Sequence, residues 1–230
     1  MPWRATPPAA AARSLLVPLY IHPAVDPGAW LALERAARRL YGVVVNVADG
    51  PGSGGRPDGV VVAAAEGLRA AGVPLFGYVD TGYGTRPVQE VDRDVRRHRE
   101  WFGVRGVFLD RVAAGRDRLP YYRRLAGAAR LGGARTVVLN PGVHPDPGYA
   151  AVCDLLVTYE GSWTDYAAAD VPGWTADHPP ERFCHLVYGV PGDAAARAVA
   201  RTAAGRGAAV HCAVPGGPPN PWQHVPAGPA

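Results

Sequence analysis

The chain contains no lysine, so all 24 basic residues among its 230 residues are arginines. This absence excludes a Schiff-base mechanism, which needs a lysine amine. It also excludes a phosphate-binding loop of the Walker type, because the glycine-rich stretch Gly52-Ser53-Gly54-Gly55 lacks the lysine that contacts the phosphates. We expect this stretch to be a flexible lid or rim beside a cleft.

Cysteine and serine are also scarce. Cys153, Cys184 and Cys212 are odd in number and show no CxxC spacing, so we expect buried free thiols, with neither a disulfide framework nor a zinc knuckle. Neither Ser53 nor Ser162 lies in a G-x-S-x-G elbow. The seven histidines show no HExxH or other ligand spacing, which predicts that the protein binds no metal and no cofactor.

Long apolar runs are missing as well. Residues 1–14 hold arginines, prolines and alanines, and we expect a flexible segment there, not a signal peptide. No later stretch approaches a membrane span, so we expect a cytoplasmic protein, unless the start is misassigned and a leader lies upstream. The net charge is +4 and the arginines are scattered through the predicted helices, so neither a membrane nor a nucleic acid is a predicted partner.

Short β-branched or aromatic runs alternate with longer stretches of alanine, arginine and leucine, which predicts strands alternating with helices. The expected strands are residues 15–23, 41–47, 73–80, 105–110, 135–140, 154–160, 184–189 and 208–214. The expected helices are residues 27–40 (N-cap Asp26), 60–71, 88–102, 119–131, 147–152 and 193–204 (capped by Asp193). Residues 15–214 are expected to form a single domain, followed by a proline- and glycine-rich tail, 215–230, extended over the surface.

The predicted strands are almost continuously apolar, which is typical of a parallel sheet covered by helices on both faces. Eight such units favour closure into a (β/α)₈ barrel of the TIM type, a single α/β domain. The alternative is an open doubly wound sheet. That fold would carry a glycine fingerprint after its first strand, and Tyr20-Ile21-His22-Pro23 has none.

Two carboxylates, Asp110 and Glu160, each end an apolar strand, and in a barrel of this kind active sites form where strands end. A carboxylate there is costly without a partner or a purpose, so we interpret both as catalytic. Such a pair suits glycosidic-bond cleavage, one carboxyl group giving a proton to the leaving oxygen and the other acting as base, nucleophile or charge stabiliser. The backbones of strands four and six are expected to lie about 9–10 Å apart, which leaves open both the stereochemistry and which carboxyl is the acid.

Further polar groups end the other strands, and we expect them to bind substrate. Each of Asn46, Asp80 and Asn140 alone fits a turn former or a helix cap, but together the strand ends describe a polar cleft. The predicted substrate-binding residues are His22, Asn46, Tyr78, Asp80, Arg111, Asn140 and Tyr188, and His211 also follows a strand. Aromatic residues that can stack on sugar rings, or simply pack, are Tyr20, Tyr78, Tyr83, Tyr159, Trp163 and Trp174.

Several motifs occur in a specific order: Val17-Pro18-Leu19-Tyr20-Ile21-His22-Pro23, Asn46 with Gly50-Pro51-Gly52, Gly77-Tyr78-Val79-Asp80-Thr81-Gly82-Tyr83-Gly84, Gly106-Val107-Phe108-Leu109-Asp110, Val137-Val138-Leu139-Asn140-Pro141-Gly142 and Val157-Thr158-Tyr159-Glu160. With them the chain resembles the spherulation-specific family 4 (Spherulin-4-like) proteins over residues 15–214. The resemblance implies a barrel similar to glycoside hydrolase family 135, which cleaves polymers of α-1,4-linked galactosamine and N-acetylgalactosamine. It implies that the family's acidic residues correspond to Asp110 and Glu160.

The chain departs from the family pattern at Arg111, where a glutamate is expected. If this position points into the cleft, arginine should abolish or redirect activity, and a guanidinium there can bind an anionic or acetylated sugar. If it points away, as alternation along a strand suggests for the neighbour of Asp110, the change is tolerated.

Two functions follow from these residues, and both have a carbohydrate as the partner. The first is a glycoside hydrolase acting on an amino-sugar polymer. The second is a catalytically silent sugar-binding barrel, with Arg111 as the mark of lost activity. A third option, an unrelated barrel enzyme such as an aldolase or isomerase, is disfavoured by the missing lysine and by the absence of a glycine-rich phosphate site near strands seven and eight.

Overall fold

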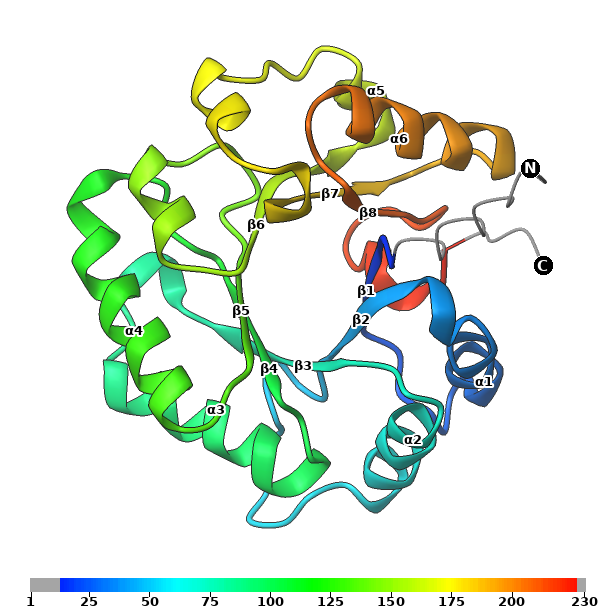
Figure 1. Cartoon of the computed structure of the whole chain (residues 1–230). Coiled ribbons are helices and arrows are strands. Elements are labelled where there is room, and N and C mark those ends of the chain that lie inside the picture. Colours follow the sequence, from blue (N-terminus) through cyan, green and yellow to red (C-terminus); the bar gives the residue numbers. More distant parts are fainter. Residues whose placement is uncertain (1–12, 227–230) are drawn as a thin grey trace, which may run out of the picture.

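The structure is a computed structural model that describes residues 13–226. Eight parallel strands pair in sequence order and close into a barrel, which confirms the predicted fold (Figure 1). The strands are β1 (Leu15–Leu19), β2 (Leu40–Val45), β3 (Leu75–Asp80), β4 (Gly106–Asp110), β5 (Thr136–Leu139), β6 (Leu155–Ser162), β7 (Phe183–Tyr188) and β8 (Val210–Ala213). Residues 1–12, most of the expected flexible segment, lie outside the described residues.

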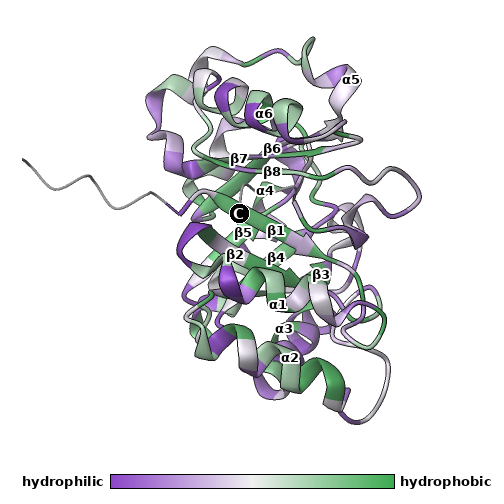
Figure 2. Ribbon diagram, turned by 90° about the vertical axis from the view of Figure 1, so that its right-hand side faces the viewer, coloured by the Kyte–Doolittle hydropathy of each residue, from purple (hydrophilic) through white to green (hydrophobic). Residues whose placement is uncertain are grey.

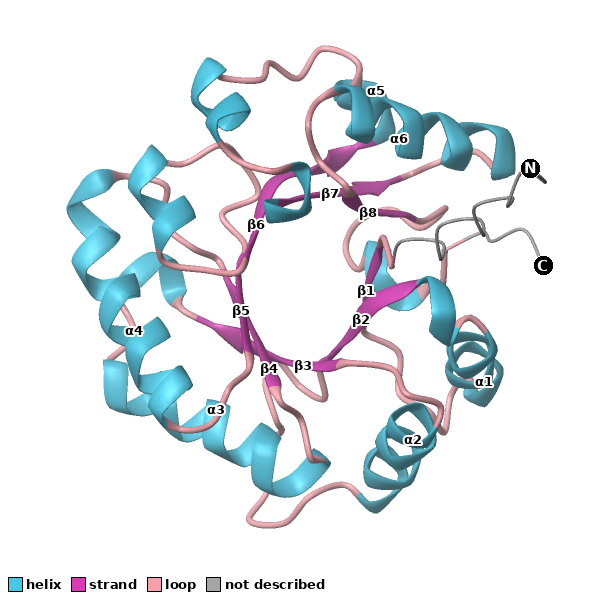
Figure 3. Ribbon diagram, in the orientation of Figure 1, coloured by secondary structure: helices cyan, strands magenta, loops and turns pink. Residues whose placement is uncertain are grey.

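Helices surround the ring of strands (Figure 3). The α-helices are α1 (Pro27–Arg35), α2 (Gly59–Ala70), α3 (Val88–Phe102), α4 (Leu119–Leu131), α5 (Trp163–Tyr166) and α6 (Asp193–Gly205). The 3₁₀ turns are η1 (Ala37–Arg39), η2 (Gly82–Gly84), η3 (Arg116–Arg118), η4 (Pro147–Ala151), η5 (Gly173–Asp177), η6 (Pro180–Arg182) and η7 (Pro221–Gln223). The connection after β5 therefore uses a 3₁₀ turn, and the connection after β6 uses the four-residue helix α5 with two 3₁₀ turns, where the other crossovers use longer helices.

The first helix begins where the sequence predicts and ends earlier. Asp26 caps α1 by accepting a backbone N–H of the first turn, as expected. The helix ends at Arg35 instead of residue 40, because the chain must turn to bring Leu40 beside Leu15 at the start of the β1–β2 pairing. Local helix propensity gives way here to the strand pairing that closes the barrel.

Of two further local predictions, one holds and one is wrong. The short helix expected at residues 147–152 is the 3₁₀ helix η4, and the Asp146 carboxylate at its start accepts the N–H of Gly148 at 2.9 Å. Asp193 does not cap α6: it is the first helical residue, and the N-cap is Gly192 at φ 110°. Only a residue without a side chain adopts that backbone conformation readily, so the cap position falls to the glycine.

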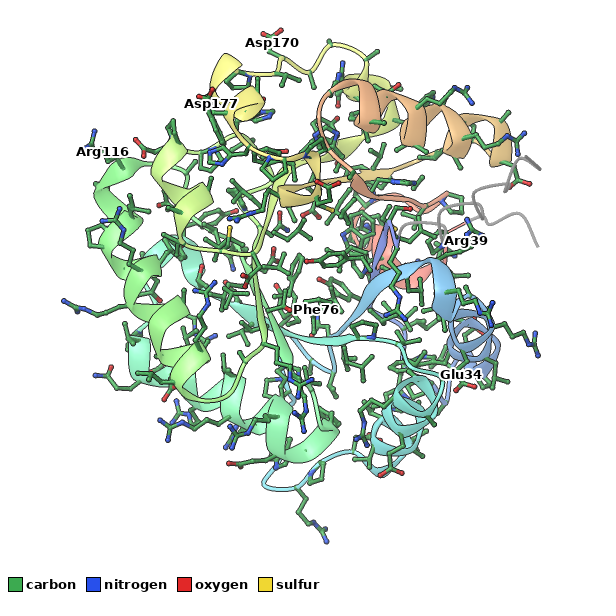
Figure 4. All side chains as sticks on the ribbon, viewed as in Figure 1. Glu34, Arg39, Phe76, Arg116, Asp170 and Asp177 are labelled. Carbon is green, nitrogen blue, oxygen red and sulfur yellow. The ribbon has the colours of Figure 1, made fainter. Side chains whose placement is uncertain are left out.

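From β4 to β8, alternate residues of a strand pack into different apolar clusters, which distinguishes the inner from the outer face of these strands. On β4, Phe108 belongs to one cluster, and Val107 and Leu109 belong to another that includes residues of α3 and α4. The first, called the inner cluster below, contains Phe76, which lies within the ring of strands (Figure 4). The strands are coloured mainly as hydrophobic and the hydrophilic colour gathers on the outer helices and loops, as a doubly covered parallel sheet requires (Figure 2).

The chain after β8 is anchored to the barrel within residues 215–226. Its 3₁₀ turn η7 lies beside β1 (Figure 1). The backbone N–H of Tyr20 donates to the carbonyl of Trp222 at 2.9 Å, and Gly189 donates to Gly216 at 2.7 Å. Most of the segment is exposed or half-buried, but Trp222 is 5% exposed and packs in the inner cluster. Burial of this side chain anchors the segment, since an indole gains more from apolar contacts than from solvent.

Among residues 13–226, no helix combines the length and the apolar character that crossing a membrane requires.

Candidate active site

Asp110 is the last residue of β4 and enters the mouth of the barrel. Phe108, two residues earlier, belongs to the inner cluster, so Asp110 continues the inward-facing side of the strand. The β3–β4 register places Asp80 opposite Asp110. The backbone N–H of Asn140 donates to the carbonyl of Leu109 at 2.9 Å, which brings the end of β5 to the other side of Asp110.

A β-bulge turns Glu160 into the same space. Val157 belongs to the inner cluster, so regular alternation would place Glu160, three residues later, on the outer face. The pairing with β7 shifts between Val157 and Tyr159, which makes Thr158 an extra residue. Glu160 then pairs with Leu186, itself an inner-cluster residue. Bulges commonly re-aim side chains beside active sites, and this one delivers the second carboxylate.

Asn140 joins the two carboxylates. Its Nδ2 donates to Oδ1 of Asp110 at 2.7 Å and to Oε2 of Glu160 at 2.5 Å. Its Oδ1 accepts the backbone N–H of Gly142 at 3.0 Å, which fixes the amide with its NH₂ group toward the carboxylates. Because both contacts share one nitrogen, the two carboxylate oxygens are separated by at most about 5 Å.

Burial governs the charge of Glu160. Desolvation, reinforced by the nearby Asp110 charge, raises the pKa of Glu160 from 4.5 to about 7. The hydrogen bonds from Asn140 and Trp222 act in the opposite direction, because they stabilise the carboxylate. Trp222 makes its contact through Nε1, 3.0 Å from Oε1. Glu160 is therefore the carboxyl group that retains a proton near neutral pH.

Asp110 also has a raised pKa, with desolvation as the main cause, but more donors oppose the shift. The hydroxyl of Tyr78, the backbone N–H of Arg111 and the amide of Asn140 all donate to its carboxylate and lower its pKa. Both carboxyl groups thus have a raised pKa, and Asp110 has more hydrogen-bond donors that favour its ionised form than Glu160 has.

The carboxylates lie between two connected cavities. The larger has a volume of about 600 Å³ and is lined by Tyr20, Asn46, Val47, Ala48, Asp49, Tyr78, Asp110, Glu160, Tyr188, Pro218, Pro219, Asn220, Pro221 and Trp222. The smaller, about 370 Å³, is lined by Tyr83, Asp110, Arg111, Asn140, Pro141, Gly142, Val143, Glu160 and Tyr188. Asp110, Glu160 and Tyr188 line both cavities, so the groove runs past the carboxylate pair in two directions.

Five of the predicted substrate-binding residues line this groove: Asn46, Tyr78, Arg111, Asn140 and Tyr188. Tyr78 and Tyr188 present aromatic rings beside the carboxylates, and Asn140 lies between them. Asn46 also lines the larger cavity, while its Oδ1 accepts the N–H of Gly50 at 2.9 Å. Asn46 therefore has the structural role that its residue type suggests and a place in the cleft as well.

His22 and His211 lie elsewhere. The Nε2 of His22 is 3.2 Å from Oδ2 of Asp58, the residue that caps α2, and His22 lines neither cavity of the groove. His211 pairs with Leu15 at the first residue of β1, which is the opposite end of the barrel from the carboxylates. Both imidazoles contribute to the scaffold in this structure.

Arg111 occupies the rim of the smaller cavity. Its φ is 50°, so the strand has already turned, and alternation no longer decides where the side chain points. The guanidinium lies 4.9 Å from the centre of the Tyr83 ring, and Nη1 is 2.9 Å from Oδ2 of Asp80. The hydroxyl of Thr81 is 2.8 Å from the carbonyls of both Asp110 and Arg111, which holds this turn.

Of the aromatic candidates, Tyr20, Tyr78 and Tyr83 line the groove. Tyr159 packs on Tyr166 on the outer side of β6, a consequence of the bulge. Trp163 packs in the same outer cluster, and Trp174 contacts Phe183 and two histidines.

Sequence reasoning missed Trp222 and the proline-rich segment that brings it to the groove. The one available signal was a tryptophan within the segment expected to be a surface tail.

Among the described residues, no group of three or more histidine, cysteine, aspartate or glutamate side chains is arranged to hold a metal ion. Cys153, Cys184 and Cys212 are buried free thiols, as expected, and burial raises the pKa of each. The chemistry available in the groove is thus that of a carboxylate pair bridged by an amide.

Known proteins share both the sequence and the fold. The model of spherulation-specific family 4 matches residues 14–216. The chain belongs to this family. It is 35% identical to Spherulin-4 of Physarum polycephalum over 150 residues, which is 64% of this chain and 44% of that protein. The chain thus spans less than half the length of that relative.

Among solved structures, the chain is similar to Aspergillus clavatus Sph3 in complex with GalNAc, with 26% identity and a TM-score of 0.76. That match covers 94% of this chain and 93% of the Sph3 chain. Deoxyribose phosphate aldolase from Aeropyrum pernix matches at 14% identity and a TM-score of 0.55, covering 90% of this chain and 86% of the aldolase chain. The second likeness shows the barrel fold alone.

Proposed function

We propose that this protein is a glycoside hydrolase that cleaves an amino-sugar polysaccharide of α-1,4-linked galactosamine and N-acetylgalactosamine. The observation that carries the proposal is the contact of one nitrogen, Nδ2 of Asn140, with both Asp110 and Glu160. It keeps one oxygen of each carboxyl group within about 5 Å of the other, which favours the short separation typical of retaining glycosidases, about 5–5.5 Å.

In this mechanism Glu160 is the general acid and Asp110 the anionic partner. Glu160 gives its proton to the glycosidic oxygen as the bond from that oxygen to the anomeric carbon breaks. Asp110, whose three hydrogen-bond donors favour its ionised form, attacks or stabilises the anomeric carbon as positive charge develops there. Glu160, now ionised, takes a proton from the water that completes hydrolysis, which restores both groups.

The substrate class is supported by the likeness to Sph3, whose crystal structure contains GalNAc. The groove adds support, since it continues past the carboxylates in both directions and has aromatic rings on each side: Tyr20 and Tyr78 in the larger cavity and Tyr83 in the smaller. Such a groove accommodates sugar units on both sides of the bond that is cut, which suits an endo-acting enzyme.

A second candidate function is a sugar-binding barrel without turnover. One observation favours it: a guanidinium stands at position 111, next to a catalytic carboxylate, where the family pattern has an acid. Against it, the Arg111 side chain contacts Asp80 and Tyr83 and neither of the two carboxylates.

The deciding experiment incubates the purified protein with α-1,4-linked galactosamine/N-acetylgalactosamine oligosaccharides and follows the products by mass spectrometry. Asp110→Asn and Glu160→Gln are assayed in parallel. We expect cleavage by the wild type and a loss of at least about a thousandfold in each variant. Binding by the wild type without cleavage would favour the silent barrel, and neither binding nor cleavage would reject the substrate class.

A further inference from the structure

Glu160 is held from a part of the chain far away in sequence. The Nε1–H of Trp222 donates to Oε1 of Glu160 at 3.0 Å across 62 residues of sequence. An indole nitrogen can only donate, and the Asn140 amide that contacts Oε2 donates as well. Both oxygens of the Glu160 carboxyl group are therefore fixed as acceptors, and the group cannot rotate without losing a hydrogen bond.

Trp222 is itself held in place. The backbone carbonyl of Trp222 accepts the N–H of Tyr20 at 2.9 Å, and the backbone N–H of Trp222 donates to Oδ1 of Asn220 at 3.2 Å. Nδ2 of Asn220 donates in turn to the carbonyl of Tyr20 at 3.3 Å. The Tyr188 ring meets the indole edge-on, with 6.3 Å between the ring centres. The segment thus attaches to both β1 and β7, and the indole has little freedom.

The other groups around Glu160 do not replace this contact. The charge of Asp110, from β4, raises the pKa of Glu160. The charge of Glu160 in turn raises the pKa of three groups, Tyr20 after β1, Cys184 from β7 and Cys212 from β8. Tyr78 and Tyr188 also line the cavity beside it. Asp110 opposes ionisation of Glu160, whereas Asn140 and Trp222 favour it through hydrogen bonds. Asn140 is shared with Asp110, so Trp222 is the donor that contacts Glu160 without contacting Asp110.

We propose that Trp222 is a positioning residue for Glu160: its indole N–H fixes the orientation of the carboxyl group and tunes its readiness to hold a proton. The proposal rests on the proposed function for its catalytic consequence, but the contact itself is testable without turnover. Removing the donor while keeping an aromatic ring, Trp222→Phe, should leave Glu160 with one donor and a stronger tendency to stay protonated.

The first test is titration of the Glu160 carboxyl carbon by ¹³C NMR in protein labelled at the glutamate carboxyls. The chain has six glutamates, Glu34, Glu66, Glu90, Glu100, Glu160 and Glu181, and Glu160→Gln identifies the signal. We expect the Glu160 signal to titrate at higher pH in Trp222→Phe than in the wild type. Trp101→Phe is the matched control, since Trp101 packs on Phe102 and Arg97 of α3, outside the groove. It should leave the Glu160 titration unchanged.

The second test uses no Trp222 variant, so it stands even if Trp222→Phe does not fold. The six indole N–H signals of the wild type are followed by ¹⁵N NMR between pH 5 and pH 9. One signal should move with the Glu160 titration and lose that dependence in Glu160→Gln. If none of the six signals follows Glu160, or if the Trp222→Phe titration matches the wild type, the proposal is overturned.

Activity gives a third readout. With the oligosaccharide substrate, Trp222→Phe should lower kcat more than it raises KM and should shift the alkaline limb of the pH profile upward. A variant with unchanged kcat and unchanged limb would contradict the positioning role. Absence of cleavage in the wild type would reject the proposed function and leave the NMR result intact.

Discussion

Arg111 and Asp80 form an ion pair at the rim of the groove, with Nη1 of the arginine 2.9 Å from Oδ2 of the aspartate. The Asp80 carboxylate also accepts the N–H of Gly82 at 2.6 Å, so its position is fixed independently of Arg111. The arginine at position 111 therefore has a local partner of opposite charge. It puts a cation beside the smaller cavity and leaves the carboxylate pair bridged by Asn140.

Replacing Arg111 with glutamine should raise KM severalfold and change kcat by less than about threefold, because the side chain lines the cavity without touching either catalytic carboxylate. Steady-state kinetics on the oligosaccharide measure both parameters. The free energy of unfolding should fall by at most about 1 kcal/mol, as is usual for an exposed ion pair. A collapse of kcat would mean that Arg111 takes part in the chemistry.

Cleavage should retain the anomeric configuration. The shared Asn140 nitrogen keeps one oxygen of Asp110 and one of Glu160 within about 5 Å of each other, which favours direct attack by Asp110 over the wider, water-spaced arrangement of inverting enzymes. Proton NMR of the first product, recorded before mutarotation, reports the anomer. An initial product of inverted configuration would contradict this geometry.

Tyr78→Phe removes a hydrogen bond to the Asp110 carboxylate. Loss of this donor should raise the pKa of Asp110, shift the acid limb of kcat/KM to higher pH and reduce kcat/KM by about ten- to a hundredfold, the effect of one hydrogen bond to a charged group. Tyr121→Phe is a matched control, because the Tyr121 hydroxyl donates to the carbonyl of Arg86, away from the groove. Equal pH profiles for the two variants would argue against the Tyr78 contact.

Glu160 should make the protein less stable as the pH rises. Its folded-state pKa of about 7 exceeds its ordinary value of 4.5, so between these values the folded state holds a proton that the unfolded state has lost. The contribution of Glu160 to the free energy of unfolding is fully present below pH 4.5 and declines as the pH rises to about 7. Urea unfolding at pH 5 and pH 8 measures the decline.

The matched variant for this effect is Glu160→Gln. Because glutamine does not ionise, the free energy of unfolding of Glu160→Gln should fall by about 2–3 kcal/mol less than that of the wild type between the two pH values, at about 1.4 kcal/mol per pKa unit. The fall in the free energy of unfolding from pH 5 to pH 8 is taken within each protein and then compared, because the glutamine amide also changes the contacts with Asn140 and Trp222. Parallel declines would show that Glu160 titrates normally.

Thr158→Val should stabilise the fold. Thr158 is the extra residue of the β6 bulge, and its buried hydroxyl has no hydrogen-bond partner among the described residues. Replacing that hydroxyl with a methyl group should raise the free energy of unfolding by about 1 kcal/mol. Thr81→Val should lower the free energy of unfolding, because the Thr81 hydroxyl contacts two carbonyls and the Tyr122 hydroxyl. Urea unfolding compares the two variants.

The barrel and the identity of the strand ends were predictable because they follow from local patterns. Apolar runs at regular intervals predict a closed parallel sheet, and the polar residue after each run predicts which face carries the site. That reasoning placed Asp110 correctly, since β4 is regular up to its last residue. It also brought Asn140 to the site, although it did not anticipate that a single amide would contact both carboxylates.

The remaining features of the site depend on interactions that no local pattern encodes. Regular alternation from Val157 places Glu160 outside the barrel, and only the shift in pairing at Thr158 turns it inward. Arg111 leaves the alternation because the chain turns there at positive φ. Trp222 reaches the groove through backbone pairing with Tyr20, about 200 residues away in sequence.

During synthesis of the chain, Trp222 is added after both carboxylates and the amide that bridges them. A ribosome completes Asp110, Asn140 and Glu160 well before the indole that donates to Glu160, which follows 62 residues later. β7 and β8 come between Glu160 and Trp222 in the sequence. A nascent or prematurely terminated chain thus carries both carboxylates and their bridging amide, but not the last donor that orients the acid.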